Sequence, residues 1–249
     1  MKIDKFISHR GTKTDFIENT MDAFRLAYEF GFKWIELDVQ MSSDGELFIF
    51  HDRTTRRLGL VDLDVTQTDI SVLKKIELID SNFKPARIPT LIEYFEWAKD
   101  ISINTNLEIK INNEDEKYQE EIVNKILNLL SEYPELKNRV LLSSFSNFVM
   151  KKLKDDSLYA KAKLYEIKNW EAEEEYIKTT LKEDFDSDNY IGLAINFQFL
   201  NKERVHLLQK LFKKIFVYSA KSDEDVKRLM SYRVDSIFID KKEQLLFTI

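Results

Sequence analysis

The stretch KWIELDVQMSSDGELFIFHD, residues 33–52, is the most informative part of the sequence for the fold. In residues 33–39 the aliphatic side chains alternate with Glu36 and Asp38, which is the period of a β-strand. The two acids therefore share one face of the strand and the aliphatic side chains share the other. If this strand belongs to a barrel, helices cover its outer face, and Glu36 and Asp38 are predicted to point into the barrel interior.

The second half of this stretch predicts a hairpin. Only SSDGE separates VQM from LFIF, and this connection is too short for a crossover helix. Asp44-Gly45 is a strong signal for a two-residue turn, so strand 46–50 is expected to run antiparallel to its predecessor. With these two residues at the centre of the turn, Asp38 lies opposite His51, which would bring the histidine beside the two acids.

Outside this stretch, apolar strand-like runs alternate with helical patterns along nearly the whole chain. The other predicted strands are 3–8, 104–109, 139–143, 161–165, 190–195, 214–218 and 235–239, and the predicted helices are 20–30, 90–99, 116–131, 146–154, 169–181, 201–213 and 223–231. Repeated βα units predict a parallel sheet. Eight parallel strands, with no GxGxxG turn, favour a closed (β/α)8 TIM barrel over a dinucleotide-binding fold. Residues 53–88, with a short helix near 69–76, form a small insertion in this pattern.

Length and composition fit one α/β domain. The chain has 249 residues, 43% hydrophobic and 33% charged, and we expect residues 1–249 to form a single TIM-barrel domain. The sequence contains no cysteine, no run long enough for a membrane span and no secretory segment, so a soluble cytoplasmic protein is expected. The net charge of −6 is local, because residues 166–188 hold nine acids and three lysines. This run is interpreted as a solvated helix face, and no nucleic-acid partner is expected.

Acidic side chains recur at strand ends, where a parallel barrel gathers its functional residues. Glu108 and Lys110 are two residues apart at the end of strand 104–109, as Glu36 and Asp38 are in the earlier strand. Carboxylates that face a barrel interior repel one another unless a positive charge lies between them. We therefore predict that a divalent cation with oxygen ligands lies between Glu36, Asp38 and Glu108.

Two of the three histidines also lie at strand ends. His9 ends the first strand with Arg10 beside it, and the hairpin brings His51 to the same mouth. Imidazoles titrate near neutral pH and suit acid–base catalysis, whereas Arg10 and Lys110 suit a phosphate. This combination predicts phosphodiester or phosphate-ester chemistry. The remaining histidine, His206, has no motif around it and is interpreted as a surface or packing residue.

The sequence resembles the glycerophosphodiester phosphodiesterases in segments spread over nearly the whole chain. These segments are HRG at 9–11, ENT at 18–20, AF at 23–24, IELDV at 35–39, DG at 44–45, HD at 51–52, EIK at 108–110, SSF at 143–145, VY within 214–218 and VD…ID at 234–240. They occur in the order that is typical of the family. The spacing of HRG, ENT, ExD and HD is the most specific part of the resemblance.

The resemblance implies a (β/α)8 barrel with a small insertion and hydrolysis of small-molecule glycerophosphodiesters to an alcohol and glycerol 3-phosphate. By analogy with the family, the glycerol 2-hydroxyl attacks phosphorus to give a cyclic phosphodiester, which water then opens. The resemblance also implies three sets of site residues: Glu36, Asp38 and Glu108 as ligands of Ca²⁺ or Mg²⁺, His9 and His51 as the acid–base pair, and Arg10 and Lys110 as phosphate contacts.

Two alternative functions stay open from the sequence. Lysophospholipase D-like hydrolysis of lysophospholipids would use the same site, and a non-catalytic phosphodiester-binding protein would use the same scaffold. The first of these needs an exposed apolar rim, for which the insertion offers Leu58, Leu60, Val61, Leu63 and Phe83. Lys221 follows strand 214–218 where the family more often has asparagine. A cation there would favour neutral or anionic head groups over choline and ethanolamine.

Overall fold

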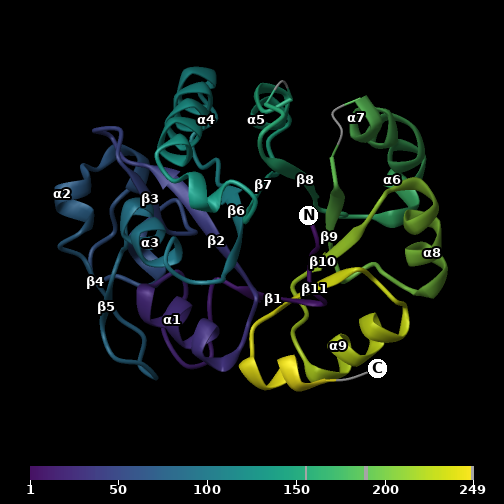
Figure 1. Ribbon diagram of the computed structural model, residues 1–249, viewed down its shortest axis with the longest axis horizontal. Coiled ribbons are helices and arrows are strands. Elements are labelled where there is room, and N and C mark those ends of the chain that lie inside the picture. The colour runs from purple at the N-terminus through teal and green to yellow at the C-terminus, as the bar shows by residue number, and fades with distance from the viewer. Residues whose placement is uncertain (155, 188–189, 248–249) are drawn as a thin grey trace.

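The computed structural model describes residues 1–154, 156–187 and 190–247, and its main sheet is a closed barrel of parallel strands (Figure 1). The barrel strands are β1 (Phe6–His9), β2 (Trp34–Met41), β6 (Asn104–Ile109), β7 (Val140–Ser144), β8 (Ala160–Tyr165), β9 (Gly192–Asn196), β10 (Ile215–Tyr218) and β11 (Ser236–Ile239). Strand β1 pairs in parallel with both β11 and β2, which closes the ring. The predicted (β/α)8 TIM barrel is confirmed.

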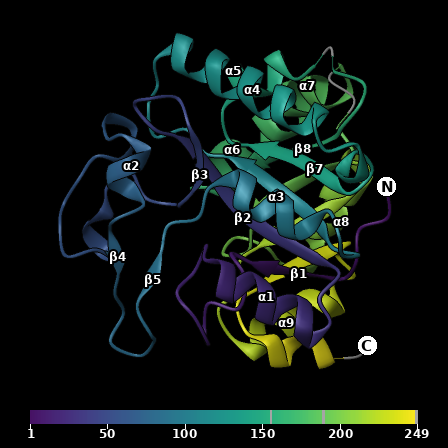
Figure 2. The ribbon, with the colours of Figure 1, turned by 60° about the vertical axis from the view of Figure 1, so that its left-hand side comes forward.

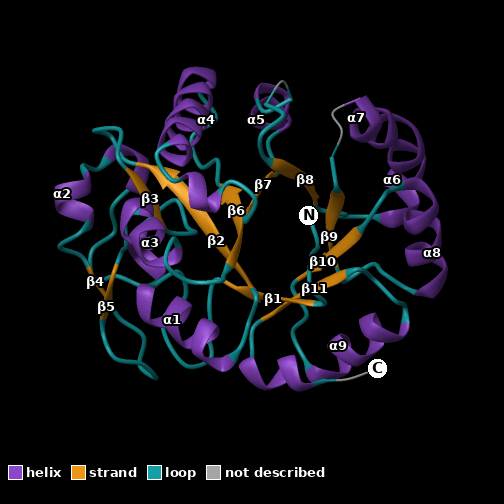
Figure 3. Ribbon diagram, in the orientation of Figure 1, coloured by secondary structure: helices purple, strands orange, loops and turns teal. Residues whose placement is uncertain are grey.

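Helices surround the ring of strands (Figure 3). They are α1 (Met21–Phe30), α3 (Leu91–Ala98), α4 (Glu116–Ser131), α5 (Asn147–Lys152), α6 (Trp170–Tyr176), α7 (Lys182–Ser187), α8 (Lys202–Leu211) and α9 (Asp223–Ser231). A π-helical turn, Ile177–Leu181, joins α6 to α7, so the helical segment is longer than the predicted 169–181. Asp188, the last acid of the predicted acidic run, lies outside the described residues. In the described part of the chain, no helix combines the length and apolarity that a bilayer crossing requires.

The first helix shows how local sequence fixes its own boundaries. The side chain of Thr20 accepts a hydrogen bond from the backbone N–H of Ala23, which satisfies one of the free donors at the helix start. The helix ends at Gly31, where φ is +108°, a conformation that favours glycine. Both boundaries agree with the sequence-based expectation.

The barrel interior changes from apolar to polar along its axis. Trp34 lies in an interior cluster with Ile7, Leu141, Ala162, Leu164, Ala194, Phe216 and Phe238. Glu36 and Asp38 follow Trp34 at alternate positions on β2, and both are buried. Ile35, on the opposite face, belongs to the main core between strands and helices. The two acids therefore point inward, as predicted.

Strand β3 (Leu47–Ile49) runs antiparallel to β2 outside the ring, but the predicted hairpin register is wrong by one residue. Met41 pairs with Leu47, and the backbone N–H of Phe50 donates to the carbonyl of Asp38 at 2.9 Å, so Phe50 and not His51 lies opposite Asp38. The connection contains three residues, 43–45, because Gly45 takes φ of +83° and its N–H donates to the Ser42 carbonyl at 3.0 Å.

The insertion at 53–88 packs on the outer side of β3 and projects from the barrel (Figure 2). It contains 3₁₀ turns at Thr55–Arg57 and Val65–Gln67, helix α2 (Ile70–Leu73) and a two-stranded sheet of β4 (Glu77–Leu78) and β5 (Ala86–Arg87). It therefore has more regular structure than its sequence predicts. Its separate apolar core consists of Ile17, Phe48, Phe50, Leu58, Val65, Leu73, Ile76, Leu78 and Ile88.

Candidate active site at the carboxyl ends of the strands

The parallel register of three neighbouring strands assembles the predicted site. His9 of β1 pairs with Glu36 of β2, and Asp38 of β2 pairs with Glu108 of β6. In a parallel barrel the residues of one such layer point to the same place. The structure thus brings together side chains that are separated by up to a hundred residues of sequence.

The three acids form one cluster. Glu36, Asp38 and Glu108 each offer a carboxylate oxygen, and these oxygens lie within 4.8 Å of one another. All three residues are buried, and Asp38 Oδ1 has no hydrogen-bond partner among the described residues. An all-oxygen donor set with a buried oxygen that accepts no hydrogen bond fits a hard divalent cation such as Ca²⁺ or Mg²⁺.

Burial and mutual repulsion place an electrostatic strain on this cluster. Burial, together with the charge of Asp38, raises the pKa of Glu36 well above its usual range. Burial would also raise the pKa of Asp38, but the charges of Arg10 and Lys110 outweigh it and hold that pKa well below the usual range. Two neighbouring carboxyls therefore differ in pKa because the cations lie closer to one of them.

The two predicted phosphate contacts lie against these acids. Arg10 Nε is 3.1 Å from Asp38 Oδ2, and Arg10 Nη1 donates to Glu18 Oε1 at 2.9 Å. Lys110 Nζ donates to Glu108 Oε1 at 3.0 Å and lies 3.6 Å from Asp38 Oδ1. Both cations therefore reach the mouth, where each already faces carboxylates of the candidate metal cluster.

A left-handed stretch of backbone positions Arg10. Arg10 has φ of +58° and Gly11 has φ of +79°. A Cβ atom at Gly11 would lie 2.7 Å from the backbone and Cβ of Ala23, so only glycine fits beside α1. The backbone N–H of Arg10 donates to Glu36 Oε2 at 3.0 Å. Strained residues of this kind persist where surrounding contacts hold them, and they are frequent at functional sites.

Each of the two predicted catalytic histidines has a carboxylate on Nδ1. His9 Nδ1 lies 2.8 Å from Asp240 Oδ1, and His51 Nδ1 lies 2.7 Å from Asp52 Oδ1. A carboxylate oxygen can only accept, so Nδ1 donates in both pairs and Nε2 is left for other contacts. Burial and the charge of Arg10 lower the pKa of His9 to about 4.

Several residues of the site were not predicted from the sequence. Asp52, Glu18 and Asp240 fall within the HD, ENT and VD…ID segments, so their segments were noticed but their roles were not. Arg57, in the first 3₁₀ turn of the insertion, carried no signal. Its Nε donates to Asp52 Oδ2 and its Nη2 donates to Glu18 Oε1, both at 2.6 Å. Arg57 thus joins the carboxylate on His51 to the carboxylate on Arg10.

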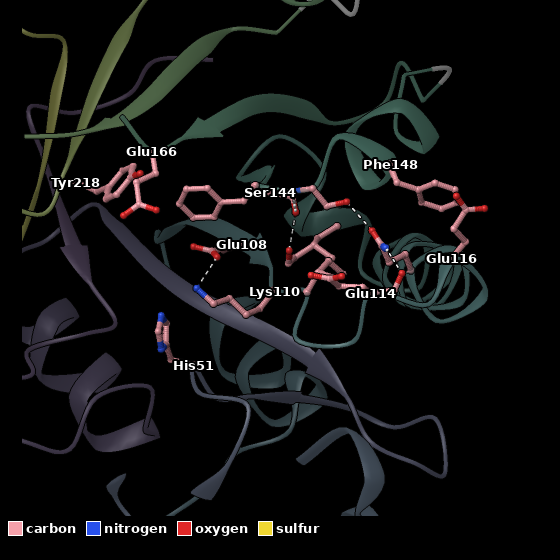
Figure 4. A pocket seen from close by; sticks show the side chains of 14 residues that line it. His51, Glu108, Lys110, Glu114, Glu116, Ser144, Phe148, Glu166 and Tyr218 are labelled. Atoms are coloured by element: carbon pink, nitrogen blue, oxygen red, sulfur yellow. Dashed lines mark hydrogen bonds and ion pairs between the residues drawn. The ribbon is translucent and has the colours of Figure 1, made fainter. Parts of the chain in front are cut away.

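Two connected cavities open at this mouth. The inner cavity, of about 130 Å³, is lined by His9, Arg10, Glu36, His51, Asn106, Glu108, Lys110, Phe145, Leu164, Tyr218 and Phe238. The outer cavity, of about 760 Å³, shares five of these residues and adds Ile109, Ile111, Glu114, Glu116, Gln119, Ser144, Ser146, Phe148 and Glu166 (Figure 4). Lys221 is exposed and lines neither cavity, and His206 is exposed on α8.

Comparison with known proteins identifies the family to which the chain belongs. Residues 9–244 match the sequence profile of the glycerophosphoryl diester phosphodiesterase family. A glycerophosphodiester phosphodiesterase of Caldanaerobacter subterraneus subsp. tengcongensis is 31% identical over 251 residues, which cover 96% of this chain and 95% of that protein.

Solved structures agree with this match. A phosphodiesterase from Oleispira antarctica, in complex with the product sn-glycerol-3-phosphate, superposes with a TM-score of 0.84 at 24% identity and covers 98% of this chain and 96% of its own. A glycerophosphodiester phosphodiesterase from Thermotoga maritima superposes with a TM-score of 0.74 at 24% identity and covers 99% of this chain and 98% of its own. At these identities the two structures support the fold alone.

Proposed function

The chain belongs to the glycerophosphoryl diester phosphodiesterase family, and from this membership we propose that it hydrolyses glycerophosphodiesters to an alcohol and sn-glycerol 3-phosphate. It is a hydrolase of the phosphodiesterase type. One observation supports the proposal above all others. Two histidines, each with a carboxylate on Nδ1, line a single cavity together with Glu36 and Glu108 of the acid cluster.

We propose that Glu36, Asp38 and Glu108 hold a divalent cation, Ca²⁺ or Mg²⁺. Support comes from the proximity of their oxygens, the absence of nitrogen or sulfur ligands in the cluster and the Oδ1 of Asp38 that accepts no hydrogen bond. When bound, such a cation would neutralise charge on the substrate phosphate and on the transition state. Arg10 and Lys110 would also contact the phosphate oxygens, as guanidinium and ammonium donors.

The two histidines divide the proton transfers according to their position. His9 lines the inner cavity alone, whereas His51 lines both cavities. In the first step the glycerol 2-hydroxyl oxygen bonds to phosphorus while His9 takes its proton. The bond from phosphorus to the leaving alcohol breaks, and His51 donates a proton to that oxygen. Water then opens the cyclic phosphodiester with the two roles reversed, which gives glycerol 3-phosphate.

Asp240 and Asp52 support these transfers as positioning residues. Each accepts the Nδ1 hydrogen of its histidine, which fixes the tautomer with a free Nε2 and stabilises the imidazolium when it forms. Lys13 Nζ lies 2.9 Å from the same oxygen of Asp240, so this carboxylate is itself held in place. The arrangement fits a pair of imidazoles that alternate between acid and base.

The lysophospholipase alternative gains no support from the apolar residues of the insertion. Leu58 is buried, and Leu63 and Phe83 pack against the insertion's own core. Leu60 and Val61 are exposed, at 82% and 54%, but neither lines a cavity of the mouth. The apolar rim that a lipid tail requires is therefore not formed by these residues.

A panel of glycerophosphodiesters, assayed for glycerol 3-phosphate release, tests the proposed function. We expect turnover with Ca²⁺ or Mg²⁺, loss of turnover in excess EDTA, and recovery when the cation is restored. If no member of the panel releases glycerol 3-phosphate, the proposed reaction is refuted. Full activity after dialysis against EDTA would refute only the metal assignment. Asp38→Ala should weaken metal binding measured by calorimetry as well as lower the rate.

A further inference from the structure

The outer cavity has the chemistry of a binding site for an organic cation. It lies next to the inner cavity, on the side where His51 would protonate the leaving alcohol, so it is the space that the alcohol must occupy. We propose that this cavity selects substrates whose leaving alcohol carries an ammonium group, and that Glu166, Phe145 and Tyr218 make the contacts. This inference rests on the proposed function and assigns the head group that it leaves open.

Two aromatic rings stand at the junction of the cavities. Phe145 follows β7 and Tyr218 ends β10, and both line the inner and the outer cavity. Their rings meet edge to face, with centroids 5.7 Å apart. The Phe145 ring already attracts a cation, because Lys110 Nζ lies 5.7 Å from its centroid. Aromatic faces bind alkylated ammonium groups well because the ring quadrupole attracts charge that water solvates weakly.

Glu166 supplies a carboxylate beside these rings. It follows β8 directly, lines the outer cavity and lies beside Tyr218 in the view of the site (Figure 4). Burial raises the pKa of the Tyr218 hydroxyl, and the charges of Glu166 and Glu108 raise it further. The Tyr218 hydroxyl donates to the backbone carbonyl of Tyr165 at 2.9 Å, so Glu166 is not its acceptor.

The charge of the outer cavity is unbalanced. Four carboxylates line it, those of Glu108, Glu114, Glu116 and Glu166, against one lysine, Lys110. Lys110 is already ion-paired with Glu108 and Asp38. Among residues 1–154, 156–187 and 190–247, the carboxylates of Glu114, Glu116 and Glu166 make no hydrogen bond or ion pair, although Gln119 Nε2 donates to the backbone carbonyl of Glu114 at 3.0 Å. An anionic head group would meet repulsion here, whereas a cation would meet carboxylates without a partner and a lining that includes the rings of Phe145 and Tyr218.

This preference is opposite to the one expected from Lys221. Lys221 is exposed and does not line the outer cavity, so its charge acts on the head group only through solvent. The carboxylates of the cavity lining act at shorter range. Glycerophosphocholine and glycerophosphoethanolamine are therefore the expected better substrates, ahead of glycerophosphoglycerol and glycerophosphoinositol.

Kinetics with matched substrates test the inference. We would compare kcat/KM for glycerophosphocholine and glycerophosphoglycerol at low salt, with wild type and with Glu166→Gln. The wild type should prefer glycerophosphocholine, and Glu166→Gln should reduce that preference about three- to fivefold, through KM more than kcat. Glu175→Gln removes an exposed acid from α6, outside both cavities, and should leave the preference unchanged.

The outcomes separate the inference from the reaction on which it rests. If neither substrate releases glycerol 3-phosphate, the proposed function fails. If both are hydrolysed and Glu166→Gln leaves their ratio unchanged, only the head-group inference fails. A second measurement uses tetramethylammonium chloride as an inhibitor, against sodium chloride at equal ionic strength. Stronger inhibition by tetramethylammonium, weakened in Phe145→Leu and in Glu166→Gln, supports the site, and equal inhibition by the two salts overturns it.

Discussion

The inner and outer cavities of this mouth hold their charged groups in different ways. At the inner cavity the three acids of the cluster are buried, with Arg10 3.1 Å from Asp38 and Lys110 3.0 Å from Glu108. In the outer cavity Glu114 and Glu166 are exposed, and within the described residues neither side chain has a bonding partner. From this difference we infer that the two sets of groups have different roles. The buried, paired groups fix the reaction geometry, and the exposed, unpaired groups set the affinity for the part of the substrate that differs between compounds.

The strongest test of these two roles is removal of the inner imidazoles. His9→Ala and His51→Ala should each lower kcat by roughly 100-fold or more, the usual scale for a general acid or base. The loss should be equal for cationic and neutral head groups, because both histidines transfer protons at oxygens bonded to phosphorus and neither contacts the charged part of the head group. The measurement is kcat for two substrates per variant.

The double variant adds a check on the histidine prediction. If the two imidazoles act in one mechanism, the double variant should be little slower than either single variant. His206→Ala, on an exposed face of α8, is the control and should keep wild-type kcat. If His51→Ala keeps its kcat and loses only its head-group preference, His51 acts in head-group binding. That outcome would contradict its assignment as a general acid.

Arg57 should give a smaller loss that is also independent of the head group. It holds Asp52 and Glu18 at 2.6 Å each, and these carboxylates orient His51 and Arg10. Because an ion pair at a half-exposed position is worth about 1 kcal/mol or less, Arg57→Gln should lower kcat by no more than about fivefold. Arg57→Lys should recover part of the loss, since an ammonium group can pair with one of the two acids.

Arg56 provides the matched control for Arg57. It is the preceding residue, its side chain is 82% exposed, and its nearest ion-pair contact is Asp62 at 3.8 Å. Arg56→Gln should leave kcat unchanged. If it lowers kcat as much as Arg57→Gln does, the effect comes from loss of positive charge in the insertion and not from the contacts of Arg57 with Asp52 and Glu18. Unchanged head-group preference in Arg57→Gln would show that the effect is confined to the inner cavity.

Lys221 should give the smallest effect. Since its side chain is exposed and outside the cavity lining, Lys221→Asn should change the ratio of kcat/KM for glycerophosphocholine and glycerophosphoglycerol less than about twofold at low salt. A several-fold rise in the preference for glycerophosphocholine would mean that the lysine does reach the head group. Residues outside the cavity lining would then also contribute to head-group selection.

The sequence predicted those parts of the molecule that follow from strand periodicity. Alternation in β2 places Glu36 and Asp38 inside the barrel, and parallel pairing then sets Glu108 beside them. The hairpin register was not predictable, because Asp44-Gly45 fits both two-residue and three-residue connections. His51 still reaches the mouth despite the wrong register. Strand β3 ends at Ile49, so the alternation of the ladder no longer decides where residue 51 points.

Side-chain contacts hold the segment around His51 instead. Gln40 Nε2 donates to the carbonyls of Phe50 at 2.6 Å and Asp52 at 3.1 Å, and Asn112 Nδ2 donates to the carbonyl of His51 at 3.0 Å. Contacts of this kind join segments that are distant in sequence. They leave no periodic pattern in the sequence from which they could be predicted. For the same reason Arg57 gave no signal. Glu166 was counted in the acidic run 166–188 and interpreted as part of a solvated helix face, but it precedes α6 and lines the outer cavity.

The contact of Arg57 with Glu18 has a consequence for protein engineering. Glu18 Oε1 accepts from Arg10 of the barrel and from Arg57 of the insertion, so one oxygen atom is shared by two modules. Exchange of the 53–88 segment between relatives therefore also exchanges the arginine that pairs with Glu18 and Asp52 at the proposed active site. A chimera whose donor segment lacks a guanidinium at this place should lose about as much kcat as Arg57→Gln.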